Sequence, residues 1–136
     1  MSKKLNLILL IDDDEPTNFL HKIIIEQHGC AQKIETVRSS MEALEFLKKR
    51  IDSSYPHPDL IFLDINMPMM DGWEFLEEYK KLQNDQKGRV VIVMLTTSLN
   101  PADKQKAEEF KEIDGFRNKP LTEEMLDDIM VDSFKD

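Results

Sequence analysis

Several apolar runs of this chain end in side chains that could take part in phosphate or metal chemistry. Three acids, Asp12 to Asp14, follow the run LILLI, and Asp64 follows LIFL. The hydroxyl residues Thr96 and Thr97 follow VVIVML, and Lys119 stands near the end of the chain. Carboxylates gathered closely need a cation to offset their repulsion, and Mg²⁺ prefers oxygen ligands. These residue types therefore indicate a cation site flanked by a hydroxyl group and an amine.

Short strands must position these side chains. The runs Leu7 to Ile11, Leu60 to Leu63 and Val90 to Leu95 are continuous and apolar, which is typical of strands buried on both faces. Two further strands are expected at Lys33 to Val37 and around Phe116. Because sites in open parallel sheets form beyond the carboxyl ends of the strands, we expect the acids, hydroxyl and amine to meet there.

Segments with helical spacing separate these strands. The first helix is expected to begin near Pro16 and to stop at Gly29. Four further helix starts are predicted from capping or turn residues, namely Ser39, Gly72, Asn100 and Thr122. The alternation predicts an α/β fold, a doubly wound five-stranded parallel sheet with helices on both faces. The buried face of the first helix is expected to consist of Phe19, Leu20, Ile23 and Ile24.

Length and composition limit the possible functions. A chain of 136 residues is expected to form one domain over residues 1–136. The net charge of −9 argues against nucleic acid as a direct partner, because neutralising phosphates requires a basic face. A single cysteine, Cys30, and the absence of a signal-peptide pattern favour a cytoplasmic setting. Every apolar run is far shorter than the roughly 20 residues of a membrane span, so no membrane is expected.

Four motifs, IDDDEP, LDINMPMMDGWEFL, MLTTS and NKPLTEEML, together resemble the receiver domains of two-component response regulators. They occur in the family's order, and the resemblance covers essentially the whole chain. It implies a flavodoxin-like fold with strand order 2-1-3-4-5. Because no output domain is expected after the last helix, we expect a stand-alone receiver. The resemblance further implies that Asp64 is phosphorylated, that Asp13 binds Mg²⁺ directly, and that Asp12 supports the metal largely through water.

The resemblance assigns roles to further residues. Asn66 would give its backbone carbonyl to the metal. Thr96 would donate its hydroxyl to a phosphoryl oxygen, and Lys119 would place its charge on another. The bond between Lys119 and Pro120 is expected to be cis. The domain would thus be a signalling protein that catalyses its own aspartyl phosphorylation and dephosphorylation, rather than an enzyme acting on a separate substrate.

The resemblance also implies a switch and two kinds of partner. Thr96 would move toward the phosphoryl group while the aromatic residue of the fifth strand, here Phe116, turns inward. This would reshape the face made by the fourth helix, the fifth strand and the fifth helix, where a downstream protein would bind. We interpret His21, His28 and His57 as lying away from the strand ends, so a sensor histidine kinase or histidine phosphotransfer protein must supply the phosphoryl group.

Simpler interpretations stay open for the single residues. Asp12 and Asp13 could be merely solvated or cap the following helix, and Asp14 is interpreted in this way. Thr96 could satisfy its hydroxyl at a strand end, and Lys119 could be a surface amine. Phe116 could be a permanently buried core residue.

Three other functional classes compete for the whole chain. A receiver-like module could bind partners without phosphate. A Mg²⁺-dependent aspartate-nucleophile phosphatase of the haloacid dehalogenase type uses the same residue types, but places its nucleophile early and its paired metal acids late, the reverse of the order here. A flavin-binding flavodoxin-like protein would need a phosphate-cradling loop after the first strand, where this chain has carboxylates.

Overall fold

Ten helices and strands alternate along the part of the chain that the computed structural model describes, residues 4–49, 56–82 and 90–134. The five predicted strands are all present, and each is followed by a helix. The elements are β1 (Leu5–Ile11), α1 (Glu15–His28), β2 (Ala31–Val37), α2 (Ser40–Lys48), β3 (Leu60–Leu63), α3 (Gly72–Lys80), β4 (Val91–Thr96), α5 (Pro101–Glu108), β5 (Ile113–Asn118) and α6 (Glu123–Ser133).

The strands form one parallel sheet in the order β2-β1-β3-β4-β5, as predicted. β3 lies between β1 and β4, so Leu60 pairs with Ile8 on one side and Val91 on the other. β2 begins at Ala31, two residues before the predicted start at Lys33. Its first residues pair with β1, which extends the strand although the sequence there is too polar to reveal it.

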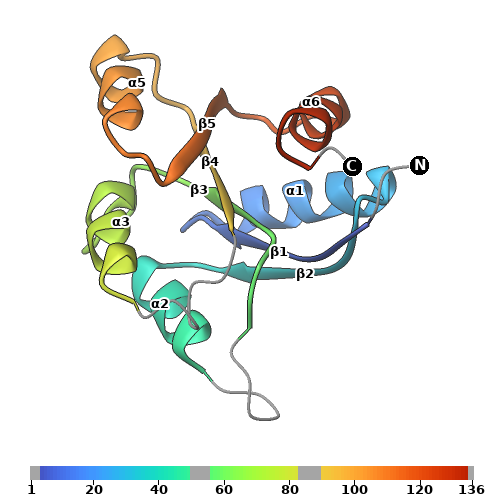
Figure 1. Ribbon diagram of the computed structural model, residues 1–136, viewed down its shortest axis with the longest axis horizontal. Coiled ribbons are helices and arrows are strands. Elements are labelled where there is room, and N and C mark those ends of the chain that lie inside the picture. The colour runs from blue at the N-terminus through green and yellow to red at the C-terminus, as the bar shows by residue number, and fades with distance from the viewer. Residues whose placement is uncertain (1–3, 50–55, 83–89, 135–136) are drawn as a thin grey trace.

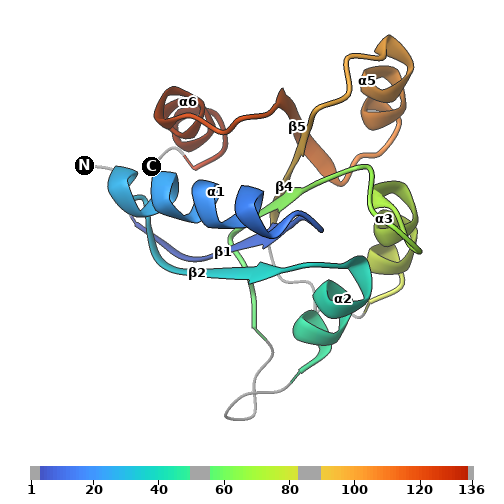
Figure 2. The ribbon, with the colours of Figure 1, turned by 180° about the vertical axis from the view of Figure 1, so that it is seen from behind.

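Helices cover both faces of the sheet, which confirms the predicted layers (Figure 1). Because side chains alternate along a strand, Leu9 and Ile11 of β1 point to one face while Ile8 and Leu10 point to the other. The first face packs against α2, α3 and α5, and the second packs against α1 and α6. Figure 2 shows α1 and α6 as neighbours, and a contact between His28 and Asp127 joins them.

The predicted apolar face of α1 is wrong. Phe19 is 66% exposed and Leu20 is 47% exposed, and Ile23 and Ile24 are only partly buried. The helix instead buries Asn18, His21 and Ile25, which share a face at helical spacing. Two of these side chains are polar and bind main-chain groups inside the protein, so the polarity of a residue did not predict its exposure.

Caps define both ends of α1. The Asp14 side chain accepts a hydrogen bond from the backbone N–H of Thr17, which confirms that this third acid caps the helix. Gly29 ends the helix with a φ of 77°, a left-handed conformation that glycine adopts without strain.

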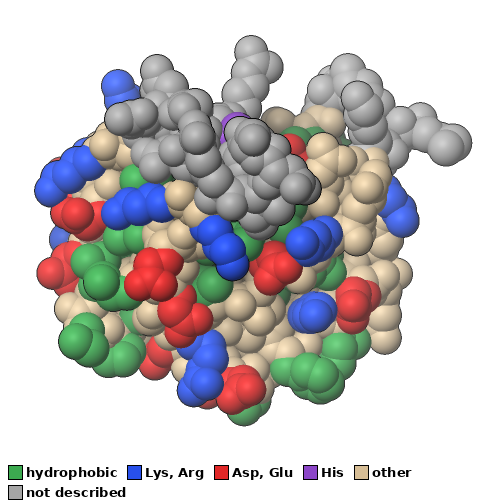
Figure 3. All heavy atoms as spheres, turned by 90° about the horizontal axis from the view of Figure 1, so that it is seen from below, with side chains coloured by type: hydrophobic (Ala, Val, Ile, Leu, Met, Phe, Trp, Pro, Cys, Tyr) green, Lys and Arg blue, Asp and Glu red, His purple; other side chains and the backbone are tan. Residues whose placement is uncertain are grey.

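The surface mixes charges of both signs. On the face seen in Figure 3, Lys and Arg side chains lie among Asp and Glu side chains, with hydrophobic side chains between them. Within the described ranges, none of the helices has the length and apolar character needed to cross a bilayer.

Candidate functional site

Asp12 and Asp64 meet at the carboxyl end of the sheet because each directly follows one of two neighbouring strands. β1 and β3 are paired through Ile11 and Leu63, so the next residue of each strand falls at the same edge. The Asp12 side chain is 6% exposed and that of Asp64 is 8% exposed, whereas Asp13 is exposed. Carboxylate oxygens of Asp12, Asp13 and Asp64 all lie within 4.8 Å of one another. The sequence therefore predicted this acidic cluster correctly.

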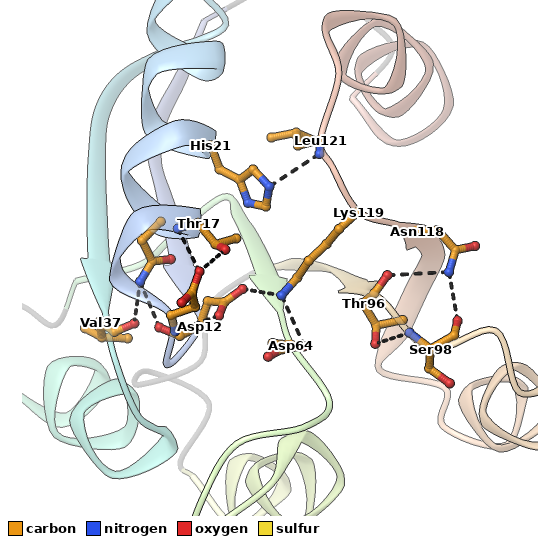
Figure 4. A network of polar contacts seen from close by, with 12 residues as sticks. Asp12, Thr17, His21, Val37, Asp64, Thr96, Ser98, Asn118, Lys119 and Leu121 are labelled. Carbon is orange, nitrogen blue, oxygen red and sulfur yellow. Dashed lines mark hydrogen bonds and ion pairs between the residues drawn. The ribbon is translucent and has the colours of Figure 1, made fainter.

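Lys119 reaches the cluster from the end of β5. Its Nζ lies 2.5 Å from Oδ2 of Asp12 and 3.5 Å from Oδ1 of Asp64 (Figure 4). The Lys119 side chain is only 13% exposed, so the interpretation as a surface amine does not hold. Its backbone N–H donates to the carbonyl of Thr96 at 2.8 Å, and the bond to Pro120 is cis as expected. An ammonium group is thus part of the site.

The electrostatics of the cluster suit a divalent cation. Burial raises the pKa of Asp64 to about 6; Lys119 opposes this rise and the neighbouring Asp12 adds to it. Three ionised carboxylates and one ammonium leave the site with a formal excess of two negative charges. Closely spaced carboxylate oxygens with this excess fit the ligands that Mg²⁺ takes. Asn66, two residues after Asp64, is exposed, and its carbonyl remains a predicted ligand.

Thr96 is the last residue of β4 and is fully buried next to this edge of the sheet. Its Oγ1 accepts a hydrogen bond from the backbone N–H of Ser98 at 3.1 Å. A hydroxyl has one hydrogen to donate besides its acceptor sites, so this contact leaves the Thr96 proton uncommitted. The local contact at the strand end is therefore compatible with donation to a further oxygen.

Gly72 presses directly on the main chain of Asp64, a contact that sequence reasoning missed. A Cβ at this position would lie 2.5 Å from the carbonyl oxygen of Asp64 and 3.0 Å from Cα of Ile65. The Gly72 N–H also donates to the carbonyl of Ile65 at 2.8 Å. Asp71 and Glu74 close this helix start with a reciprocal capping box. The start of α3 therefore fixes the backbone of the candidate phosphorylation site.

Asn18 was also missed by the sequence analysis. Its Nδ2 donates to the carbonyl of Asp12 at 2.8 Å and to that of Val37 at 3.3 Å. The amide thereby ties the end of β1 to the end of β2. The spacing of Asn18, His21 and Ile25 on one helix face was the available signal, but their mixed polarity concealed it.

The interpretation of His21 as lying away from the strand ends is wrong. His21 is 2% exposed, and it lines a small cavity beside Asp12 and Asp64. Its Nε2 accepts the backbone N–H of Leu121 at 3.4 Å. Burial, assisted by the nearby charge of Lys119, lowers the pKa of His21 below its usual value. An imidazole whose neutral form is favoured by burial therefore lies beside the acidic cluster.

Phe116 is half-buried on β5, so it is not a fully buried core residue. It lines a surface hollow of about 230 Å³ between α5 and β5, together with Ala107 of α5. Its inward movement remains a prediction.

A second aromatic contact joins α3 to the segment after α5. Phe110 stacks on Trp73 of α3 with ring centroids 5.6 Å apart, and Nζ of Lys106 lies 4.9 Å from the centre of the Trp73 ring.

Two relatives are similar to most of this chain. It is 35% identical over 101 residues to the hybrid signal transduction histidine kinase D of Dictyostelium discoideum. It is 34% identical over 98 residues to the response regulator Rcp1 of Synechocystis sp. (strain ATCC 27184 / PCC 6803 / Kazusa). The matches cover 73% and 71% of this chain. The chain spans only 6% of the kinase and 65% of Rcp1, which is less than two thirds of either relative.

Solved structures share the fold across nearly the full length. A two component response regulator from Cytophaga hutchinsonii superposes with a TM-score of 0.83 at 32% identity, covering 98% of this chain and 100% of that one. The Mn²⁺-bound form of Rcp1 gives a TM-score of 0.73 at 26% identity, with 93% of each chain covered. The family model of the response regulator receiver domain matches residues 8–130. With its parallel sheet and acidic cluster, the chain therefore belongs to the response regulator receiver domain family.

Proposed function

We propose that this protein is the phosphoacceptor of a two-component phosphorelay. Asp64 would receive a phosphoryl group from a phosphohistidine of a sensor histidine kinase or a histidine phosphotransfer protein. The observation that carries the proposal is the convergence of Asp12, Asp13 and Lys119 on Asp64 at one end of the sheet. Membership of the receiver family supports it.

The chemical step is a displacement at phosphorus. An oxygen of the Asp64 carboxylate forms a bond to phosphorus while the bond from phosphorus to the donor imidazole nitrogen breaks, leaving an acyl phosphate and a free imidazole. The attacking carboxylate must be ionised, and with a pKa of about 6 it is mostly ionised at neutral pH. Lys119 reduces the repulsion between this anion and the incoming phosphoryl group. Water would later hydrolyse the acyl phosphate and regenerate Asp64.

Asp12, Asp13 and Asp64 would hold a Mg²⁺ ion, with the backbone carbonyl of Asn66 as a further ligand. When bound, this ion supplies positive charge that stabilises the transferring phosphoryl oxygens. In our assignment Asp13, the exposed acid, binds directly and Asp12 acts largely through water. The solved Mn²⁺-bound form of Rcp1 supports a divalent cation in this family.

Thr96 and Lys119 would bind two phosphoryl oxygens after the transfer, the first with its hydroxyl and the second with its ammonium group. Movement of Thr96, followed by Phe116, would then change the surface formed by α5, β5 and α6. A downstream protein would bind this surface.

We assign residues 1–136 to one receiver domain. The free, buried thiol of Cys30 is compatible with the expected cytoplasmic location.

Intact mass after incubation with acetyl phosphate tests the proposal. The wild type should gain one phosphoryl group, only with Mg²⁺ present, and Asp64→Asn should gain none. Asp14→Asn is the matched control, because Asp14 caps α1 and Asn retains a capping side chain; it should label like the wild type.

Two other outcomes would replace the proposal. Absence of both an adduct and released phosphate would favour a receiver-like module that binds without phosphate. Rapid release of inorganic phosphate without a trapped adduct would favour an aspartate-nucleophile phosphatase. Unchanged labelling of Asp64→Asn would reject Asp64 as the acceptor.

A further inference from the structure

His21 is buried in a position where it can control the main chain next to Lys119. It lies on the inner face of α1, one helical turn from Asn18, and only 2% of its surface is exposed. Burying an imidazole is unfavourable unless its nitrogen atoms find hydrogen-bonding partners. The partner that the structure provides is a main-chain group rather than a carboxylate.

The contact of His21 determines which nitrogen of the ring carries the proton. Nε2 accepts the N–H of Leu121, so this nitrogen must be unprotonated and the proton of the neutral ring must be on Nδ1. Figure 4 shows the ring directed at the backbone of Leu121, from α1 toward the connection between β5 and α6. Burial and the nearby Lys119 lower the pKa of His21, which favours the neutral form that this contact requires.

Two hydrogen bonds hold the main chain on either side of the Lys119 side chain. The N–H of Lys119 itself donates to the carbonyl of Thr96 at 2.8 Å, and the N–H of Leu121 donates to His21. The first bond ties the connection to β4, and the second ties it to α1. Leu121 is 1% exposed and packs in the core between the sheet and α6.

The reach of the Lys119 side chain makes this anchoring important. Its ammonium must extend from the β5 end of the sheet to Asp12 at the end of β1. It contacts Asp12 at 2.5 Å and Asp64 at 3.5 Å, so a displacement of the main chain by an ångström would change both contacts. Misplacing a group of an active site by this amount can reduce a rate by up to about a hundredfold.

We propose that His21 is a positioning residue for Lys119. It holds the connection between β5 and α6 against α1 and thereby sets where the ammonium lies relative to Asp12 and Asp64. The consequence for phosphorylation rests on the proposed function. The placement of Lys119 itself can be measured in the unphosphorylated protein, where it is independent of that function.

His28 provides a matched control on the same helix. It lies two turns after His21, and its Nε2 contacts Oδ1 of Asp127 on α6 at 2.7 Å. Replacing His28 by Leu removes a histidine contact between α1 and α6. This contact does not involve the connection between β5 and α6 that carries Lys119.

The experiment compares the full-length wild type with His21→Leu, His21→Gln and His28→Leu. Nitrogen-15 NMR of the unphosphorylated protein reports the tautomer of His21, the Leu121 amide and the Lys119 ammonium group. Acetyl phosphate with Mg²⁺ then gives the maximal phosphorylation rate and the donor concentration at half of that rate. Thermal unfolding checks that each variant is folded.

We expect the Nδ1–H tautomer in the wild type and a changed Lys119 ammonium signal in His21→Leu. The maximal rate of this variant should fall roughly tenfold with little change in the half-saturating donor concentration, because the group is misplaced but the donor still binds. His21→Gln should recover most of the rate, since its amide oxygen can accept the same N–H. His28→Leu should retain the wild-type rate and Lys119 signal.

A wild-type rate and Lys119 signal in His21→Leu would overturn the proposal, as would an equal loss in His28→Leu or a His21 ring protonated on Nε2. If His21→Leu does not fold, the His21 tautomer of the wild type and the Lys119 signal of His21→Gln decide. Nδ1–H in the wild type together with a retained Lys119 signal in His21→Gln supports the proposal, whereas Nε2–H in the wild type or a lost Lys119 signal in His21→Gln overturns it. If the wild type forms no phosphoryl adduct, the proposed function fails, and the NMR measurements still decide the placement of Lys119.

Discussion

The centre of the sheet and its β5 edge are packed very differently. All four residues of β3 are buried, and so are five of the six residues of β4. Each residue of β5 is at least partly exposed, and α5 buries only Ala107. β3 leads directly into Asp64 and β4 ends in Thr96, whereas β5 carries Phe116. Asp64 and Thr96 are thus held by a dense core, while the surface proposed to respond to phosphorylation is loosely packed and loses few contacts when it moves.

The pairing between β4 and β5 shows the same difference. Its register shifts after Ile92, because Ile92 pairs with Ile113 and Val93 pairs with Gly115. The carboxylate of Asp114, the residue between them, accepts the N–H of Ile92 at 3.0 Å. A side chain thus takes the place of a main-chain partner at this edge, which makes the edge strand less regular than its neighbours.

Cavity-forming substitutions should separate the two regions most strongly. Leu63→Ala in β3 should lower the free energy of unfolding by about 3 kcal/mol, because its fully buried side chain leaves a cavity. Ile113→Ala in β5 should lower it by only about 1 kcal/mol, because Ile113 is only partly buried. Urea unfolding measures both. Equal losses would show that the two regions are packed alike.

Replacing a glycine by alanine should give the next largest difference in stability between the two regions. Gly72→Ala should lower the free energy of unfolding by about 2 kcal/mol and slow phosphorylation, because its Cβ would collide with the carbonyl of Asp64. Gly115→Ala on β5 is the control, since its Cβ would make an ordinary contact 3.5 Å from Val93. Thermal unfolding and the acetyl phosphate assay test both variants. A harmless Gly72→Ala would contradict the close contact.

The charge of Asp64 gives a pH-dependent prediction. Its folded-state pKa of about 6 lies above the ordinary 3.8, so protonation stabilises the fold below about pH 4 and this contribution is lost as the pH rises through 6. Without Mg²⁺, Asp64→Asn should therefore match the wild type near pH 4 and exceed its stability above pH 6 by about 2 kcal/mol, allowing for partial solvation.

Chemical unfolding at several pH values, without and with Mg²⁺, measures this effect of Asp64→Asn. Because the cation favours the ionised carboxylate, Mg²⁺ should reduce or reverse the advantage of the variant. A stability difference that does not change between pH 4 and 7 would contradict the raised pKa.

The smallest effect is expected at the contact between α3 and α5. Lys106→Gln removes the ammonium group over the Trp73 ring and should lower the free energy of unfolding by about 0.5 kcal/mol. Lys104→Gln, on the same helix, is the control for the loss of a surface charge. Urea unfolding at high precision compares them. A loss above about 2 kcal/mol would show that α5 depends on this contact far more than its packing indicates.

The sequence predicted the centre of the molecule better than its helix surfaces. Continuous apolar runs identified β1, β3 and β4, and the chain order of a parallel sheet then brought Asp12 and Asp64 together. The prediction that Lys119 belongs to the site depended on the family resemblance, because no neighbouring residue in the sequence distinguishes it from a surface lysine. Phe19 was assigned to the core because apolar side chains usually are buried.

The missed residues depend on contacts between distant segments. Asn18 and His21 are buried because main-chain groups of Asp12, of β2 and of the connection after β5 need partners at that point, which only the assembled fold reveals. Gly72 was predicted as a helix start, which is correct. That it also leaves room for the Asp64 carbonyl could not be inferred from neighbouring residues.

The stack of Trp73 on Phe110 gives this protein a built-in optical reporter. Trp73 is the only tryptophan of the chain, so all tryptophan emission comes from this point. It follows Gly72, which contacts Asp64, and it touches Phe110 just beyond α5. The fluorescence of a single native residue therefore reports from the boundary between the dense core and the loosely packed edge, and rapid-mixing experiments can follow that boundary without an added dye.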